Sequence, residues 1–515
     1  MAYIIRQKIK GRVYLYEVES YWDSEKKQPR QRRKYLGKEN PETGEAITPR
    51  KGFRPRAARN FGNTYVLGQV ADACGLRSVL AEAFGEDAEL LLQLACYQVS
   101  ESRPLYLFRS WQEGNHTPLT EEYSSQRLSR FVARLGEMDR EREDFFACWI
   151  KRQGAPRAVV FDITSLSSYA RLVDLVEWGY NRDGEGLPQV NLGMAFGQPV
   201  NLPLAYRVCP GSVADVSTLA TTTTFLREYG LEELSYVLDR GFYSMANVAR
   251  MVVEGVRFVV PVPFTSKWAT ALVAKHRKEL TSAVNGFCFQ KQALSHVRAR
   301  VEVGGQPVWA HIYYDRKRQA EEEGTFIRRL VEIEAEMTAH RFKGRKAAAA
   351  CLNRLWKGAN RLFTVTFRDG RVELHRKPKA MSRLVNRMGY ALMLSNEEAL
   401  GRDEVLLAYR RRDAVEKLFD ILKNELRENR LRAHSRTAVE GRLFLCYLAM
   451  ILYSSLDNAM RERELYKYYT IAEVLAELKT LRSVEMTSGR SYLTEMTKRQ
   501  RTLMEKLRIP LPVAT

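Results

Sequence analysis

An aspartate interrupts one strongly apolar, strand-like run of this chain, and a second aspartate ends another. Asp162 follows Val159-Val160-Phe161, and Asp239 follows Tyr236-Val237-Leu238. A buried carboxylate is costly unless it has a partner or a metal ion. The chain must therefore place both aspartates where their charge is compensated or used, unless both are only turn or cap residues at the ends of their strands.

The segment around both aspartates alternates between strand and helix patterns. Strands are expected over 158–166, 190–196, 202–208, 234–239 and 256–262, and helices over 217–229 and 244–254. This order is typical of an α/β core with a mixed sheet. Open α/β folds place their sites at strand ends, where two converging carboxylates form a hard-oxygen site suited to Mg²⁺ or Mn²⁺.

The composition is that of a folded and strongly basic protein. The length of 515 residues predicts about three domains, and 82 Lys and Arg against 61 Asp and Glu give a net charge of +21. Fibrous, membrane-spanning and small disulfide-rich classes are excluded. The seven cysteines contain no Cys-x-x-Cys pair, and no signal-peptide pattern is present. We expect a cytoplasmic protein without a membrane partner, and nucleic acid is the commonest acidic partner for such a charge.

The charge is concentrated in two segments. Residues 1–60 hold 16 basic and 7 acidic side chains, a net of +9, and residues 341–390 hold 14 and 2, a net of +12. The rest of the chain is balanced. This segregation favours two electrostatic footprints for a polyanion over general solubility, although two solvated faces without a ligand would look the same.

The N-terminal third predicts a small β-rich region, a linker and a helical region. Strands are expected over 3–9, 13–20 and 30–36, and 37–59 is interpreted as a linker. In the helical region, Ser124 or Ser125 is placed to cap a helix with Leu128 and Leu135 on its inner face. Its other face carries Arg127, Arg130 and Arg134, so it is either a DNA-contacting helix or an ordinary amphipathic one.

The chain after residue 262 predicts an inserted, partly β region and then helices. Hairpins are expected at 297–314 and 363–375, with helices over 328–340 and 346–357. From Glu404 the pattern is helical almost to the end, with a possible break near Gly489. In the first of these helices Tyr409, Arg412, Glu416 and Lys423 fall within an arc of roughly 60° at about 100° per residue.

That polar face presents a third acid beside two cations and a phenol. The apolar stripe of Val415, Leu418, Phe419 and Leu422 would dock the helix on the sheet. A metal ligand next to phosphate-binding cations is what phosphoryl transfer needs. The alternative is a plain amphipathic helix with an i,i+4 charge pattern.

Taken together, these motifs resemble those of bacterial insertion-sequence transposases of the DDE class. Asp162 lies in Val-Phe-Asp-Ile-Thr-Ser, Asp239 lies in Leu-Asp-Arg-Gly-Phe-Tyr-Ser, and the spacing of Tyr409, Arg412, Glu416 and Lys423 is that of the branch with a Tyr-Arg-Glu-Lys signature. Four further segments are also similar to that branch: Gly179-Tyr-Asn-Arg-Asp-Gly, Leu187-Pro-Gln-Val, Pro210-Gly211-Ser212 and Lys34-Tyr-Leu-Gly37. The similarity covers most of the chain.

The resemblance implies a fold and a division into domains. The fold class is α/β, a ribonuclease-H-like core interrupted by a β-rich insertion domain, with a small β-rich N-terminal domain and helical flanking regions. The expected divisions are 1–48, basic and DNA-binding; 60–153, helical and DNA-binding; 154–262, the first part of the core; 263–395, the basic insertion; 396–433, the second part of the core with the Glu helix; and 434–515, helical, with a possible role in dimerisation.

The resemblance also implies a chemistry. Asp162, Asp239 and Glu416 would be the catalytic residues and would hold two Mg²⁺ or Mn²⁺ ions. Family members bind terminal inverted repeats as a homodimer on double-stranded DNA, cut the 3′ strand with water, and join the freed 3′-hydroxyl to target DNA. In this branch a hairpin end often forms first.

Other residues are assigned to DNA. Tyr409, Arg412 and Lys423 would hold phosphates near the cleaved bond, and Arg240 would do likewise. Tyr390 corresponds in position to an aromatic that stacks on a flipped base in hairpin-forming relatives, although a core tyrosine is the better interpretation. Trp356 is a weaker candidate.

Two other functions remain open from the sequence. The same three acids would serve a nuclease that cuts DNA without joining it. A domesticated DNA-binding protein of the same fold is the non-enzymatic alternative, against which the three intact acids argue. The expected location is the bacterial cytosol, associated with the nucleoid.

Overall fold

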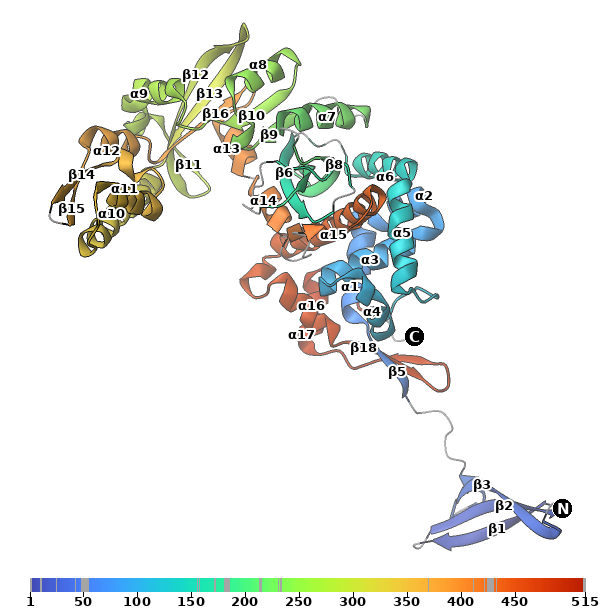
Figure 1. The fold of residues 1–515 in the computed structure, drawn as a ribbon. Coiled ribbons are helices and arrows are strands. Elements are labelled where there is room, and N and C mark those ends of the chain that lie inside the picture. Colours follow the sequence, from blue (N-terminus) through green and yellow to red (C-terminus); the bar gives the residue numbers. More distant parts are fainter. Residues whose placement is uncertain are drawn as a thin grey trace. The chain divides into compact units, whose positions relative to one another are not determined.

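A computed structural model of the protein (Figure 1) divides into two compact units. It describes residues 2–512 except 10, 11, 25, 42, 48–54, 155, 157, 171, 172, 180–185, 213, 214, 230, 232, 233, 369, 411, 421, 424–429 and 432. The first unit comprises Met1–Val70, Tyr106–Tyr123 and Ala459–Thr515. The second comprises Ala71–Leu105 and Ser124–Asn458, and it contains all three candidate catalytic acids.

The first unit begins with a four-stranded antiparallel sheet in chain order. Its strands are β1 (Ala2–Ile9), β2 (Arg12–Asp23), β3 (Gln28–Glu39) and β4 (Ala46–Ile47). The three strands expected from the sequence are confirmed, and the turn at residues 10 and 11 lies outside the described residues. On β3, the side chains of Arg30, Arg32, Arg33 and Lys34 are all exposed.

A second, three-stranded sheet corrects two predictions about the first unit. Its order is β19 (Ser491–Leu493), β18 (Arg482–Met486) and β5 (Pro55–Asn60). Residues 55–59 were expected in a linker, but they belong to strand β5 because β18 supplies a partner that the local sequence does not reveal. The expected helix with a break near Gly489 is a hairpin, and this glycine has a φ of 80°. Residues 48–54 of the predicted linker lie outside the described part.

Helices complete the first unit. They are the part of α1 (Gly62–Cys74) up to Val70, α4 (Phe108–Gly114), α16 (Ile471–Lys479) and α17 (Lys498–Lys506), while the end of α1 from Ala71 belongs to the second unit. Capping boxes at Thr470 and Thr497 fix where the last two begin, because each threonine hydroxyl accepts from a backbone N–H of the first turn.

The helical part of the second unit is built around a long apolar helix. This helix is α15 (Arg436–Glu462), and the others are α2 (Leu76–Phe84), α3 (Ala88–Glu101), α5 (Ser125–Glu137) and α6 (Asp139–Arg152). Helix α5 confirms its prediction: the Ser124 side chain caps it, and Leu128 and Leu135 are buried. Helix α15 is long and apolar enough to cross a membrane by length and composition, and 72% of its most apolar window is buried inside the protein.

Two glycines allow α5 and α15 to approach closely. A Cβ atom on Gly136 would overlap the carbonyl of Thr437, and one on Gly441 would overlap the carbonyl of Val132. Only residues without a side chain fit at these two positions, so the crossing of the helices depends on both.

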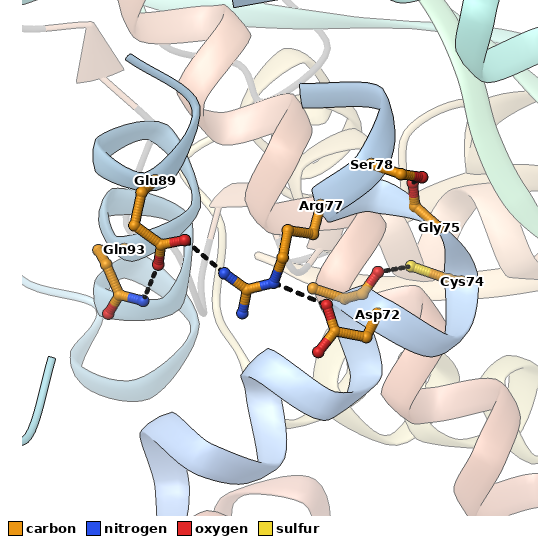
Figure 2. Close-up of polar contacts among 8 residues, drawn as sticks. Asp72, Cys74, Gly75, Arg77, Ser78, Glu89 and Gln93 are labelled. Carbon is orange, nitrogen blue, oxygen red and sulfur yellow. Dashed lines mark hydrogen bonds and ion pairs between the residues drawn. The ribbon is translucent and has the colours of Figure 1, made fainter. Parts of the chain in front are cut away.

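A charged cluster ties the ends of α1, α2 and α3 together (Figure 2). The Arg77 guanidinium donates to Asp72 at 2.6 Å and also contacts Glu89, which in turn accepts from the Gln93 amide at 2.8 Å. The carboxylates raise the pKa of Arg77 although burial acts to lower it. The charged groups of the cluster are paired with one another, whereas the buried Oε1 of Gln93 has no hydrogen-bond partner among the described residues.

The second unit contains one large mixed sheet. Along its main path the strand order is β11-β12-β13-β16-β10-β9-β6-β7-β8. Its central part consists of β6 (Ala158–Ser168), β7 (Gln189–Gln198), β8 (Leu202–Pro210), β9 (Ser235–Leu238) and β10 (Arg257–Pro261), with α7 (Asp215–Glu228) and α8 (Met245–Val253) between strands. Strands β6, β7 and β8 are antiparallel, whereas β9 and β10 run parallel to β6. All seven elements were expected, and the sheet is compatible with a ribonuclease-H-like core.

The segment predicted as a β-rich insertion differs from that description. Strands β11 (Gly286–Phe289), β12 (Gln292–Val303), β13 (Gln306–Tyr314) and β16 (Tyr390–Ser395) extend the central sheet instead of forming a separate β domain. The segment also contains the helices α9 (Lys267–Thr281), α10 (Arg316–Ala339), α11 (Arg345–Leu355) and α12 (Pro378–Val385). The structure is therefore as much helical as β here, and the strands join the larger sheet because β10 offers an open edge to β16.

Between β13 and β16, residues 315–389 pack around a core of their own. Helices α10, α11 and α12 cover the hairpin of β14 (Phe363–Arg368) and β15 (Arg371–Arg376), and Figure 1 shows them grouped in gold. The buried centre includes Leu330, Ile333, Leu352 and Phe363. We call residues 315–389 the inserted module.

Candidate active site

Asp162 and Asp239 occupy equivalent positions on neighbouring parallel strands. The paired register of β6 and β9 ends at Phe161 and Leu238, and the next residue in the chain is in each case the aspartate, Asp162 within β6 and Asp239 directly after the end of β9. Equivalent residues of parallel strands point to the same face of a sheet. The two carboxylates, each partly exposed, therefore lie beside each other.

A tight turn fixes the position of Asp239. Its carbonyl accepts from the Phe242 backbone N–H at 3.0 Å, which closes the short turn Arg240–Phe242. The Phe242 ring is buried and packs edge-on against Phe161, with centroids 5.8 Å apart. This aromatic pair lies one residue before Asp162 and three after Asp239, so it supports both acids, and the Arg-Gly-Phe sequence that forms it is visible in the chain.

Arg412 connects Asp239 to Glu416. One guanidinium nitrogen donates to the carboxylate of Asp239 and the other donates to Glu416. The Arg412 side chain is only 11% exposed. Burial acts to lower the pKa of Arg412, but nearby negative charge raises it overall. Among the carboxylates, this effect decreases from Asp239 to Glu416 to Asp162. A single cation therefore lies within the field of all three acids.

The prediction of a single helix from Glu404 onward is wrong. The structure has α13 (Arg402–Arg410) and then α14 (Asp413–Asp420). The Arg412 N–H donates to the Tyr409 carbonyl at 3.1 Å, and the Arg412 carbonyl accepts from Val415 at 2.8 Å, so a new helix starts there. The uninterrupted 100° spacing assumed from the sequence fails because Arg412 is held by a tertiary contact with the sheet.

The predicted polar face is nevertheless partly assembled. The Arg412 guanidinium lies 5.4 Å from the centroid of the Tyr409 ring, and Glu416 is its ion-pair partner. Lys423 follows α14, with its side chain half-buried. Val415 and Leu422 are buried, as the apolar stripe predicted.

The donor set fits divalent cations by its chemistry. Carboxylate oxygens are the ligands that Mg²⁺ and Mn²⁺ prefer, and Asp239 and Glu416 already share one cationic partner. Within the described residues, no three His, Cys, Asp or Glu side chains are grouped closely enough to hold a metal ion. The guanidinium of Arg412 contacts both the second and the third acid.

The remaining predicted DNA residues fall into two groups. Arg127, Arg130 and Arg240 are exposed, whereas Tyr390 is 4% exposed and stacks on Tyr314 with centroids 4.6 Å apart. Burial raises the pKa of Tyr390. Tyr390 is thus the core tyrosine that the sequence left open, and base stacking by this residue does not fit the conformation described. Trp356 is half-buried against the core of the inserted module.

Both basic segments expose their charge. In residues 341–390, twelve of the fourteen Lys and Arg side chains are exposed, and of those twelve only Arg376 forms an ion pair among the described residues. Of the motifs quoted for the resemblance, residues 180–184 lie outside the described part, whereas Gly211 donates to the Leu175 carbonyl at 3.2 Å.

The comparison with protein families shows the family of the chain. The family model of the transposase DDE domain matches residues 154–452, which include Asp162, Asp239 and Glu416. The chain belongs to the transposase DDE domain family. This membership supports DNA transposase function, in a class of metal-dependent enzymes that cleave DNA. The family model covers the transposase DDE domain as a whole, and the bacterial insertion-sequence branch is a narrower group than this family.

Two further comparisons add little. No curated protein matches the chain. Among solved structures, the cryo-EM structure of a piggyBac transposase synaptic complex with hairpin DNA is similar at a TM-score of 0.32 and 9% identity, over 85% of this chain and 86% of that one. At that TM-score the similarity supports no argument about this DDE-family chain.

Proposed function

We propose that this DDE-family protein is the transposase of a bacterial insertion sequence and that Asp162, Asp239 and Glu416 are its catalytic residues. The alignment of Asp162 with Asp239 on β6 and β9, with Arg412 joining Asp239 to Glu416, is the observation that carries the proposal. The protein would bind the terminal inverted repeats of its element, cut the ends and join them to target DNA.

The reaction consists of two phosphoryl transfers. In the first, water attacks the phosphorus at the element end, the bond from phosphorus to the 3′ oxygen breaks, and the leaving oxygen takes a proton to become a 3′-hydroxyl. In the second, that hydroxyl attacks a target phosphodiester and releases a target 3′-hydroxyl. A hairpin end would form if the hydroxyl first attacked the opposite strand. Two bound Mg²⁺ or Mn²⁺ ions would supply the charge that activates the attacking oxygen and stabilises the leaving oxygen.

The protein's own residues would bind and orient the DNA. The planar guanidinium of Arg412 can contact a phosphate through two N–H groups, and its present partners are carboxylates. Tyr409 lies against this guanidinium, and the exposed Arg240 directly follows Asp239. Together with Lys423, these side chains would hold phosphates beside the acids.

Further DNA contact is proposed for the two basic segments and for α5. The exposed Arg30, Arg32, Arg33 and Lys34 on β3 and the exposed cations of the inserted module suit the phosphate backbone. Arg127 and Arg130 would extend the contact from α5. We further propose a ribonuclease-H-like core, a homodimer on DNA and a location in the bacterial cytosol.

Strand joining separates this function from its alternatives. Purified protein is incubated with Mg²⁺, a duplex carrying a candidate terminal repeat and a supercoiled target plasmid. A transposase yields cut ends and joined products, a nuclease yields only cut ends, and a DNA-binding protein yields neither. Asp162→Asn should abolish cleavage while retaining DNA binding, and cleavage unchanged by this variant would refute the site.

A further inference from the structure

Three arginines from three different elements line a pocket formed by β8, α7 and α8. Arg207 comes from β8, Arg227 from α7 and Arg250 from α8, and the pocket has a volume of about 590 Å³. This volume lies within the range of small-molecule sites. None of the candidate catalytic or DNA-binding residues lines it.

The three arginines differ in how their charge is balanced. Arg250 forms an ion pair with Glu254 at 2.7 Å, one turn along α8. Neither Arg207 nor Arg227 forms an ion pair with a carboxylate among the described residues, although Arg207 interacts electrostatically with the mostly buried Glu440. Glu228 is the second acid of the lining, so the wall has one positive charge in excess. Two guanidinium groups are thus available to an anion.

One of these groups is held in place by an aromatic ring. The Arg207 guanidinium lies 4.9 Å from the centroid of Phe225, a buried residue of α7. Stacking of this kind orients a guanidinium and leaves its N–H edge free to donate. Arg227 is exposed on the same helix, two residues further along the chain. The hydroxyl of the buried Thr223, which bonds to the Leu219 carbonyl at 2.9 Å, contributes polar lining.

We infer that this pocket binds a phosphate group. Planar guanidinium groups contact phosphate oxygens in pairs, and such charge-assisted bonds are stronger than neutral ones. The carboxylates of Glu228 and Glu254 repel any anion in the pocket, so binding depends on direct bonds from the guanidinium groups. The phosphate would come either from a DNA backbone or from a free phosphorylated molecule. The inference does not depend on the proposed cleavage reaction.

Calorimetric titration of the full-length protein tests the site with three probes: inorganic phosphate, pyrophosphate and a dinucleotide with one phosphodiester. We expect saturable binding that Arg227→Ala weakens about tenfold or more, because a charged hydrogen bond is lost. Arg227→Lys keeps the positive charge but loses the planar guanidinium, so it should recover part of the affinity that Arg227→Ala loses. The exposed Arg103 provides a matched control, and Arg103→Ala should bind as the wild type does.

The outcomes distinguish the two sources of the phosphate, and they distinguish the phosphate pocket from the proposed cleavage site. Binding of phosphate and pyrophosphate alone indicates a free ligand, and binding of the dinucleotide as well indicates a DNA backbone. Asp162→Asn should lose cleavage and keep phosphate binding, so failure at one site is distinguishable from failure at the other. Equal affinity of the wild type and Arg227→Ala, or no saturable binding of any probe, would overturn the inference. Circular dichroism of each variant verifies that it is folded.

Discussion

The guanidinium of Arg412 is bound to the carboxylate of Asp239, across 173 residues of sequence. The same guanidinium contacts Glu416 from the adjoining nitrogen. A cation that a side chain provides therefore occupies the space between two of the three acids proposed to hold metal ions. Binding of Mg²⁺ or Mn²⁺ would have to compete with this guanidinium, and DNA phosphate would offer it another partner.

Removal of Arg412 should strengthen the binding of divalent cations. In Arg412→Ala the carboxylates of Asp239 and Glu416 lose their common partner, so Mn²⁺ no longer has to displace it. We expect several-fold tighter Mn²⁺ binding without DNA, measured by electron paramagnetic resonance, together with weaker binding of cleaved ends. Arg410→Ala is the control, because Arg410 is also a half-buried arginine but donates to neutral Gln292 at 2.5 Å. Equal Mn²⁺ affinity in both variants would contradict this account.

Alanine at Gly136 should destabilise the second unit. The added Cβ would overlap the Thr437 carbonyl, so α5 and α15 would have to move apart. Overpacking of this kind costs about 1–3 kcal/mol. Gly114→Ala, at the end of α4, is the matched control because no atom lies within 4 Å of its added Cβ. Urea unfolding of the two variants measures the difference, and an unchanged midpoint for Gly136→Ala would refute the close crossing.

The sequence was sufficient to predict the strands and helices that local patterns determine. Apolar runs with turn residues between them predicted the strands of the central sheet, and Ser124 predicted the start of α5. The two aspartates could be singled out as candidates because a buried carboxylate is costly without a partner or a metal ion, and their catalytic role stays a prediction. Their alignment on β6 and β9 is a property of strand pairing, which depends on partners distant in the chain.

The errors arise where a distant partner overrides local preference. Pro55–Asn60 is a strand only because β18 pairs with it, and the helix containing Tyr409 breaks at the point where Arg412 reaches the sheet. The Arg207, Arg227 and Arg250 pocket was missed for the same reason. Each arginine is unremarkable in its own segment, and only the fold brings the three together.

A buried histidine pair should make stability fall in mild acid. His296 and His311 lie 3.2 Å apart, ring nitrogen to ring nitrogen, on β12 and β13. Burial lowers the pKa of His296 to about 4 and that of His311 to about 3. The neutral forms contribute fully to the stability of the folded state at pH values above the unfolded pKa of about 6.5. This contribution is lost as the pH falls towards the pKa values of the folded state.

The size of this effect follows from proton linkage. At pH 5 each unfolded histidine binds a proton that the folded one does not, which costs about 2 kcal/mol per residue relative to pH 7 or above. Urea unfolding of the wild type and of His296→Phe at pH 7.5 and pH 5 measures it. His296→Phe should be less stable than the wild type at both pH values, because His311 loses a partner. Its free energy of unfolding should, however, fall less between pH 7.5 and pH 5 than that of the wild type. The exposed His375 provides the control His375→Phe, and an equal loss in the wild type and His296→Phe would argue against a buried neutral pair.

Deletion of the inserted module should leave the central sheet intact and weaken DNA binding. Its two ends meet, because Tyr314 pairs with Tyr390 and the Asp315 N–H donates to the Gly389 carbonyl at 2.8 Å. A short Gly-Ser linker can therefore replace residues 316–388, and β13 keeps its partner β16. Binding to duplex DNA, measured by fluorescence anisotropy over a range of salt, should become weaker and less salt-dependent, by about 0.9 in the logarithmic slope per lost phosphate contact. A full-length variant with Lys343, Arg345 and Lys346 changed to glutamine should shift the slope in the same direction, since all three are exposed. An unchanged slope in both variants would show that this charge does not contact DNA.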